Sequence, residues 1–121
     1  MTIFPKRPPR LTEIFDPSPI FFVTFNTAGR RPILANPAIH DAFVSYALAG
    51  IDLGVAIGRY VIMPDHIHLF VALGRERTLG APIGGLKRRL GDVAVQSNHD
   101  LHRCRVWQDG FFDHVLRSTE S

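Results

Sequence analysis

The sequence predicts an α+β domain. Three observations predict it: runs of β-forming residues that alternate in polarity, two amphipathic helical stretches, and the order of these segments. The chain has 121 residues, a length that suits one domain. Its 45% hydrophobic residues are enough for a core, and its 21% charged residues do not suit a disordered chain. No apolar run approaches the roughly 20 residues of a membrane span, and no signal peptide is expected.

The first part of the chain predicts an arm, a strand and a helix. Residues 1–19 carry five prolines beside basic residues, which favours an extended basic arm, with a disordered leader as the alternative. Residues 20–28, IFFVTFNTA, alternate as a strand does. Asn36 then suits an N-cap and Pro37 a first helical position, so we expect a helix over 37–50.

The second part of the chain predicts a hairpin, a helix and a final strand region. Residues 55–63 and 66–73 are apolar runs separated by a Pro-Asp turn, which indicates an antiparallel hairpin. Residues 81–98 carry an apolar helical stripe, and 104–118 supply one or two short strands. The order βαββαβ is that of the ferredoxin-like class, an antiparallel sheet with two helices on one face.

Two histidines in the run 66–73 are the main candidate site. His66 and His68 point the same way because strand residues i and i+2 share a face. The apolar residues between and after them belong under the helices, so the histidines face the open side. Two neutral imidazoles can ligate one divalent cation, which can polarise a phosphate oxygen. A solvated polar pair without function is the alternative.

The hairpin turn also places a tyrosine. If Met63 pairs with His66 across the turn, Tyr60 falls on the face opposite the histidines. A turn one residue longer or shorter would reverse this placement. Asp65, in the turn, is a candidate acceptor that orients a histidine, and a turn-capping role is the alternative.

Basic residues favour a polyanionic partner. The formal net charge is +3 and the sequence pI is about 9.6. Lys87, Arg88 and Arg89 face away from the apolar stripe of the second helix and are candidate DNA-phosphate contacts, with a solvated helix face as the alternative. His114 is a candidate metal or phosphate contact, or an edge histidine with a hydrogen bond. The single cysteine, Cys104, excludes an internal disulfide and suits a cytosolic setting.

The segment GRYVIMPDHIHLFV resembles the signature of HUH single-strand nucleases. It is most similar to the single-tyrosine transposases, especially the REP-associated tyrosine transposases of bacteria. The segments FFVTFNTAGRRP, LKRRL and VWQDGFFDHVLRS agree with this resemblance. It covers the chain from Ile20 to the last residue.

The resemblance implies a ferredoxin-like domain with the histidine strand at the centre of the sheet. It implies that Mg²⁺ or Mn²⁺ binds to His66 and His68, and that a tyrosine on a later helix attacks a DNA phosphate to form a 5′-phosphotyrosine link. The chain ends at Ser121, where that helix is expected, and Tyr46 and Tyr60 do not match its position. We therefore expect residues 20–121 to be a transposase-like domain truncated before the tyrosine helix, with no catalytic tyrosine in this chain.

The function expected from this resemblance is DNA transposition, in which single-stranded or hairpin DNA is nicked and rejoined. One alternative is a DNA-binding module that holds a hairpin without cutting it. Another is an interaction or metal-binding module unrelated to DNA. The expected partner is single-stranded or hairpin DNA, with no membrane and with a homodimer as one possible assembly. The expected location is the bacterial cytoplasm, at the nucleoid when DNA is bound.

Overall fold

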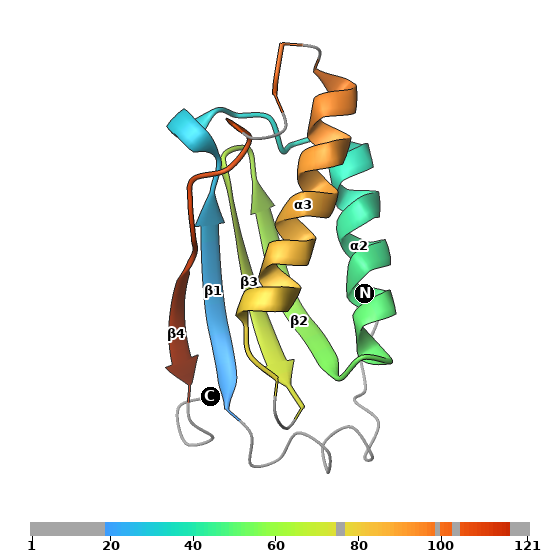
Figure 1. Cartoon of the computed structure of the whole chain (residues 1–121), viewed down its shortest axis with the longest axis vertical. Coiled ribbons are helices and arrows are strands. Elements are labelled where there is room, and N and C mark those ends of the chain that lie inside the picture. The colour runs from blue at the N-terminus through green and yellow to red at the C-terminus, as the bar shows by residue number, and fades with distance from the viewer. Residues whose placement is uncertain (1–18, 75–76, 99, 103–104, 117–121) are drawn as a thin grey trace.

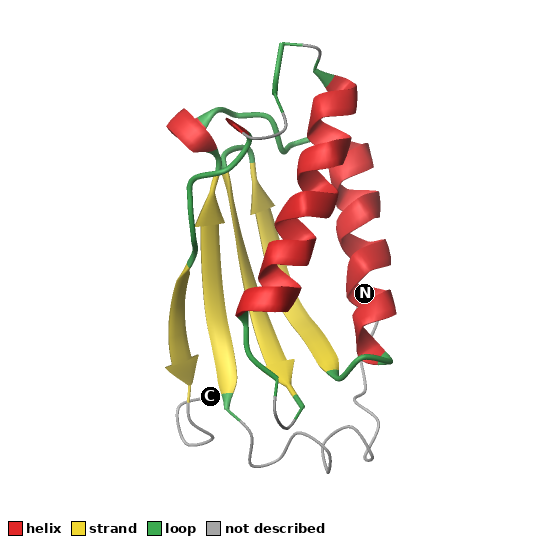
Figure 2. Cartoon of the chain, in the orientation of Figure 1, coloured by secondary structure: helices red, strands yellow, loops and turns green. Residues whose placement is uncertain are grey.

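The fold is one sheet with two helices packed on one of its faces (Figure 1). The computed structural model describes residues 19–74, 77–98, 100–102 and 105–116, so residues 1–18 of the expected basic arm lie outside it. Figure 2 separates the helical layer from the strands. The elements are β1 (Ile20–Asn26), the 3₁₀ turn η1 (Ala28–Arg30), α2 (Pro37–Ile51), β2 (Val55–Met63), β3 (His66–Leu73), α3 (Gly80–Ser97) and β4 (Phe112–Leu116).

The sheet has the strand order β2-β3-β1-β4, and every neighbouring pair is antiparallel. This order confirms the ferredoxin-like arrangement, since β3 lies between β2 and β1 and the two helices cross on one side. In the described part of the final region there is one strand, β4, preceded by an isolated bridge between Thr27 and Trp107. Among the described residues, no helix is both long and apolar enough to cross a membrane.

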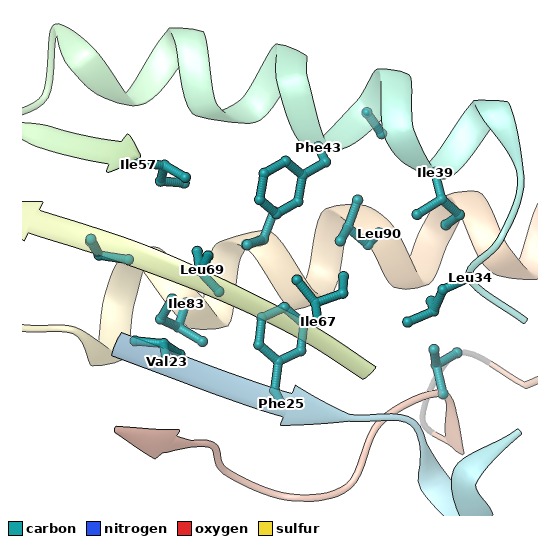
Figure 3. Packing of buried hydrophobic residues seen from close by; sticks show 14 of the residues in the cluster. Val23, Phe25, Leu34, Ile39, Phe43, Ile57, Ile67, Leu69, Ile83 and Leu90 are labelled. Atoms are coloured by element: carbon teal, nitrogen blue, oxygen red, sulfur yellow. The ribbon is translucent and has the colours of Figure 1, made fainter. Parts of the chain in front are cut away.

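The core lies between the helices and one face of the sheet. Alternate residues of each strand point into it, because strand side chains alternate between faces. Ile67, Leu69 and Val71 on β3 are completely buried, as is Phe43 on α2. Figure 3 shows Ile67, Leu69 and Phe43 in the layer between the helices and the strands. Burying each such side chain contributes about 1.5–3 kcal/mol, so the period-2 pattern fixes which face of the sheet is covered.

The predicted start signals of α2 have their expected roles in the structure. The Asn36 side chain accepts a hydrogen bond from the backbone N–H of Ile39, at 2.9 Å, and Pro37 takes the first helical position. The helix ends at Ile51, one residue beyond the predicted end. Gly54 then adopts a φ of 81°, which favours glycine, and the chain turns into β2.

The β2–β3 hairpin has the predicted register. Met63 pairs with His66 and Tyr60 pairs with Leu69, so Tyr60 lies on the helix side of the sheet. A bulge between Ile57 and Tyr60 interrupts β2, leaving Gly58 and Arg59 opposite one residue of β3. The extra residue lets both halves of β2 keep their apolar side chains under the helices.

The two helices approach closely at a glycine. The Tyr46 hydroxyl of α2 donates a hydrogen bond to the backbone carbonyl of Pro82 on α3, at 2.8 Å. Burial raises the pKa of this hydroxyl. A side chain at Gly85 would meet the Tyr46 hydroxyl, whereas one at Gly84 would meet nothing within 4 Å. Gly85 is therefore required for helix contact, although glycine in general weakens a helix.

Alanine substitutions at these neighbouring glycines should have opposite effects. Gly84→Ala should raise the free energy of unfolding by roughly 0.5–1 kcal/mol, because alanine is the better helix former. Gly85→Ala should lower it by about 1–3 kcal/mol, because the new methyl group overpacks the contact with Tyr46. Urea unfolding followed by circular dichroism measures both changes.

A Tyr46→Phe background provides the control. It removes the atom nearest to the new methyl group, so the cost of Gly85→Ala should shrink there. An equal cost in both backgrounds would show that the helix contact is not its source.

Candidate functional site

The uncovered face of the sheet, called the open face below, carries the two histidines. His66 and His68 lie side by side on β3, with ring centroids 4.7 Å apart and ring planes at 77°. Both are partly buried. The predicted placement is confirmed, because the residues that alternate with them are completely buried under the helices.

An acidic partner orients His66. Its Nδ1 lies 2.8 Å from an Asp65 carboxylate oxygen, and the other oxygen of that carboxylate accepts a 2.9 Å hydrogen bond from Arg30 Nε. These two bonds, the one from His66 first, lower the pKa of Asp65. An ionised carboxylate can only accept, so neutral His66 carries its proton on Nδ1 and leaves the lone pair of Nε2 free.

A hydroxyl and a phenyl ring position His68. Its Nδ1 lies 2.8 Å from Thr24 Oγ1, and its ring stacks on Phe22 at 5.4 Å and 17°. Burial, and then the nearby charge of His66, lower the pKa of His68. A lowered pKa favours the neutral imidazole at pH 7, which is the form that binds metal ions. As for His66, the Nδ1 contact leaves Nε2 as the ring nitrogen without a protein partner among the described residues.

A buried threonine holds the turn that precedes the histidines. Thr27 is completely buried, and its backbone N–H donates to the Asp65 carbonyl at 3.0 Å. Its hydroxyl lies 2.8 Å from the carbonyl of Arg31 and 3.2 Å from that of Asp65. The Leu34 N–H also donates to the Pro64 carbonyl, at 2.9 Å. The turn is thus bonded to the loop after β1, which fixes where Asp65 presents its carboxylate.

The remaining sequence-predicted residues do not join the pair. His114 is exposed on the open face of β4. Because β1 lies between β4 and β3, these two strands are about 10 Å apart. Within the described ranges, no group of three or more histidine, cysteine or acidic side chains is arranged to hold a metal ion.

The basic residues of α3 lie on the helical layer, on the other side of the sheet from the histidines. Arg88 and Arg89 are exposed there. Lys87 instead donates to the carbonyls of Gln108 and Gly110, at 2.9 and 2.8 Å. Burial lowers the pKa of Lys87, and Asp109 acts in the opposite direction. Lys87 therefore fastens α3 to the segment before β4.

Trp107 has a related structural role. Its Nε1 donates to the Lys87 carbonyl at 2.7 Å, and its ring meets Phe25 edge-on at 5.0 Å. Trp107 therefore packs against the core.

Sequence reasoning missed Arg30. It lies 35 positions before its partner Asp65, and only the fold brings the two together. The one local signal was the Gly-Arg-Arg break after the first strand, which indicates a turn and not a contact.

Both tyrosines of the chain are on the helix side. The Tyr60 ring packs on Phe43 at 4.5 Å, and its hydroxyl lies 2.7 Å from His40 Nε2. Tyr46 is held between α2 and α3. Neither hydroxyl is on the open face with the histidines, as the sequence predicts.

A cavity of about 210 Å³ lies away from the histidines. It is lined by the second half of α2, the start of β2 and the start of α3, including Leu53, Val55 and Arg77. The histidines sit at the other end of β2 and β3, so this cavity is not the candidate site. The imidazole nitrogens on the open face can bind a metal ion, which the apolar lining of the cavity cannot.

Comparison with known proteins supports the fold. No protein-family model matches the sequence, and no curated protein matches it significantly. A candidate transposase from Deinococcus radiodurans superposes with a TM-score of 0.64 and 13% identity, over 82% of this chain and 79% of that one. A REP-associated tyrosine transposase bound to a REP hairpin gives 0.63 and 19% over 83% of this chain. The chain has a transposase-like fold. It spans 57% of the length of the REP-associated protein.

Acid should remove the stabilising effect of Asp65. Because its pKa is lowered on folding, its contribution is fully present above the ordinary value near 3.8 and is lost as the pH falls through the folded value. The difference in free energy of unfolding between the wild type and Asp65→Asn should therefore be constant near neutral pH and shrink in acid. Urea unfolding at a series of pH values measures it, and a difference that persists unchanged at low pH would contradict this account.

Proposed function

We propose that this chain is a transposase-type domain that binds single-stranded or hairpin DNA across its open face, with Mg²⁺ or Mn²⁺ on His66 and His68. The observation that carries the proposal is the orientation of the two imidazoles. Each has its Nδ1 in a hydrogen bond to a side chain, which leaves both Nε2 atoms for a ligand. The fold that presents them is shared with transposases, one of which is described as bound to a REP hairpin.

The side chains present fit a divalent ion. Asp65 fixes the tautomer of His66, an arrangement that is common around histidine ligands, and Thr24 orients His68. When bound, the ion would polarise a DNA phosphate oxygen and stabilise the charge that develops on it. Two protein ligands leave coordination positions open for the phosphate and water, and they also imply weak binding.

The rest of the open face suits a single-stranded polyanion. No carboxylate occupies a described strand position on that face, whereas aromatic rings recur there. Phe22 contacts both His68 and Phe70. Phe112 pairs with Thr24 on the neighbouring strand and is 67% exposed. Exposed rings provide surfaces on which unpaired bases stack, worth about 1–3 kcal/mol per base.

The alternative function is a module that holds DNA without cutting it. Attack on a phosphate needs an oxygen nucleophile aligned with the leaving group. Tyr46 and Tyr60 are both engaged on the helix side, so neither presents its hydroxyl to the histidines. A covalent protein–DNA band on a denaturing gel, formed with Mn²⁺, would separate cutting from holding.

Manganese should bind through the histidine pair. Titration of Mn²⁺ into the wild type in a calorimeter should give weak, saturable heat, and the His66→Ala/His68→Ala variant should give none. His114→Ala tests the third histidine of the open face: wild-type heat would place it outside the site, and reduced heat would include it. Equal heats from the wild type and the double variant would sink the metal proposal.

DNA binding should prefer unpaired bases and depend on Phe112. A labelled hairpin with single-stranded tails should bind more tightly than a blunt duplex of the same length. Phe112→Ala should weaken binding by about 1–3 kcal/mol, and Phe112→Trp should keep it, because either ring can stack. Val115→Ala is the matched control: it is exposed on the same strand but points to the other face. Fluorescence anisotropy measures all four proteins, and equal losses at Phe112 and Val115 would rule out stacking there.

A further inference from the structure

We infer that Arg30 forms a phosphate subsite beside the histidines and takes the phosphate next to the one held at His66 and His68. This inference rests on the proposed function and adds to it a residue that anchors the strand. The chemical class of ligand is a backbone phosphodiester.

The guanidinium of Arg30 is fixed at one end and free at the other. Its Nε donates to Asp65, while its two terminal nitrogens have no protein partner among the described residues. Its side chain is 53% exposed. A guanidinium held through Nε can still present its outer edge to two oxygens of a phosphate, a geometry that a lysine does not offer.

The same carboxylate positions Arg30 and His66. Asp65 bonds Arg30 with one oxygen and His66 with the other, so the guanidinium Nε lies within about 8 Å of His66 Nδ1. The free Nε2 of His66 is at the far side of its ring. Arg30 thus lies beside the His66–His68 site. Its separation from that site suits contact with the next phosphate along the same DNA strand.

The backbone at Arg30 supports a role beyond folding. Its φ is 54°, and it is the one described non-glycine residue with a positive φ. This conformation costs an L-residue about 1–2 kcal/mol. It directly follows Gly29, at 65°, and the Arg30 N–H donates to the Thr27 carbonyl at 3.1 Å. Backbone strain of this kind clusters at active sites and ligand sites, where the surrounding structure maintains it.

The local charge also favours an anion. Arg31 is exposed next to Arg30, and Asp65 is the acidic group that contacts Arg30. Because two arginines stand against one carboxylate, the rim of the open face keeps net positive charge at this point. The exposed arginines of α3 have the same charge but lie on the helical layer, across the sheet from the histidines.

The test combines one variant with single neutral phosphates. In a series of labelled hairpins with single-stranded tails, each tail phosphate in turn is replaced by an uncharged methylphosphonate. For the wild type, neutralising the contacted phosphate should weaken binding. For Arg30→Gln, the same replacement should have no further effect, and the slope of log affinity against log salt should fall by about 0.7, the value for one single-strand contact.

Two variants separate contact from folding. Arg77→Gln removes an equal charge near Gly54, at the other end of β2, and should leave both the salt slope and the phosphate pattern of the wild type. Arg30→Lys keeps the charge and should restore the slope of the wild type with weaker affinity.

The outcomes distinguish this inference from the function on which it rests. No binding of any hairpin by the wild type would overturn the proposed function. Binding in which Arg30→Gln retains the wild-type slope and the wild-type response to every methylphosphonate would overturn the Arg30 subsite alone. A uniform loss of affinity with every phosphate response intact would assign Arg30 to the stability of the loop and would also overturn the subsite.

Discussion

The alternation of side chains along β3 is the constraint on which the other features depend. Ile67, Leu69 and Val71 are completely buried under two helices, so the residues between them must face the other way. Burial on one side therefore fixes the position of His66 and His68 on the other. Since a slip of one residue would put both imidazoles in the core and three apolar side chains in water, the packing energy of the core also maintains the site.

Patterns within short segments predicted most of the fold. The cap at Asn36 and the proline after it located the start of α2, and the βαββαβ order gave the sheet topology. The register of the hairpin followed from counting back across its two-residue turn, which placed Tyr60 on the helix side. The placement of the histidine pair was predictable because it needed only the period of a strand and the side on which the helices lie.

Contacts between distant segments could not be predicted from the sequence. The sequence predicted Thr27 as the end of a strand. In the structure it is buried and forms hydrogen bonds to the turn before His66. Arg30 and Asp65 meet only because these hydrogen bonds join their loops. Lys87 had the charge of a phosphate contact, yet two backbone carbonyls near β4 occupy its ammonium group. The charge of a side chain indicates which groups it can bind, whereas the fold determines which of those groups lies next to it.

The bulge in β2 makes the length of that strand adjustable. In a regular strand, a residue gained or lost turns every later side chain to the opposite face. Here Gly58 and Arg59 together occupy the place of one residue, so the pairs on either side keep their phase independently. The half near the hairpin turn pairs with the histidines, and the other half packs against the end of α2. Changes in chain length can thus accumulate at the bulge while the two ends of the sheet diverge separately.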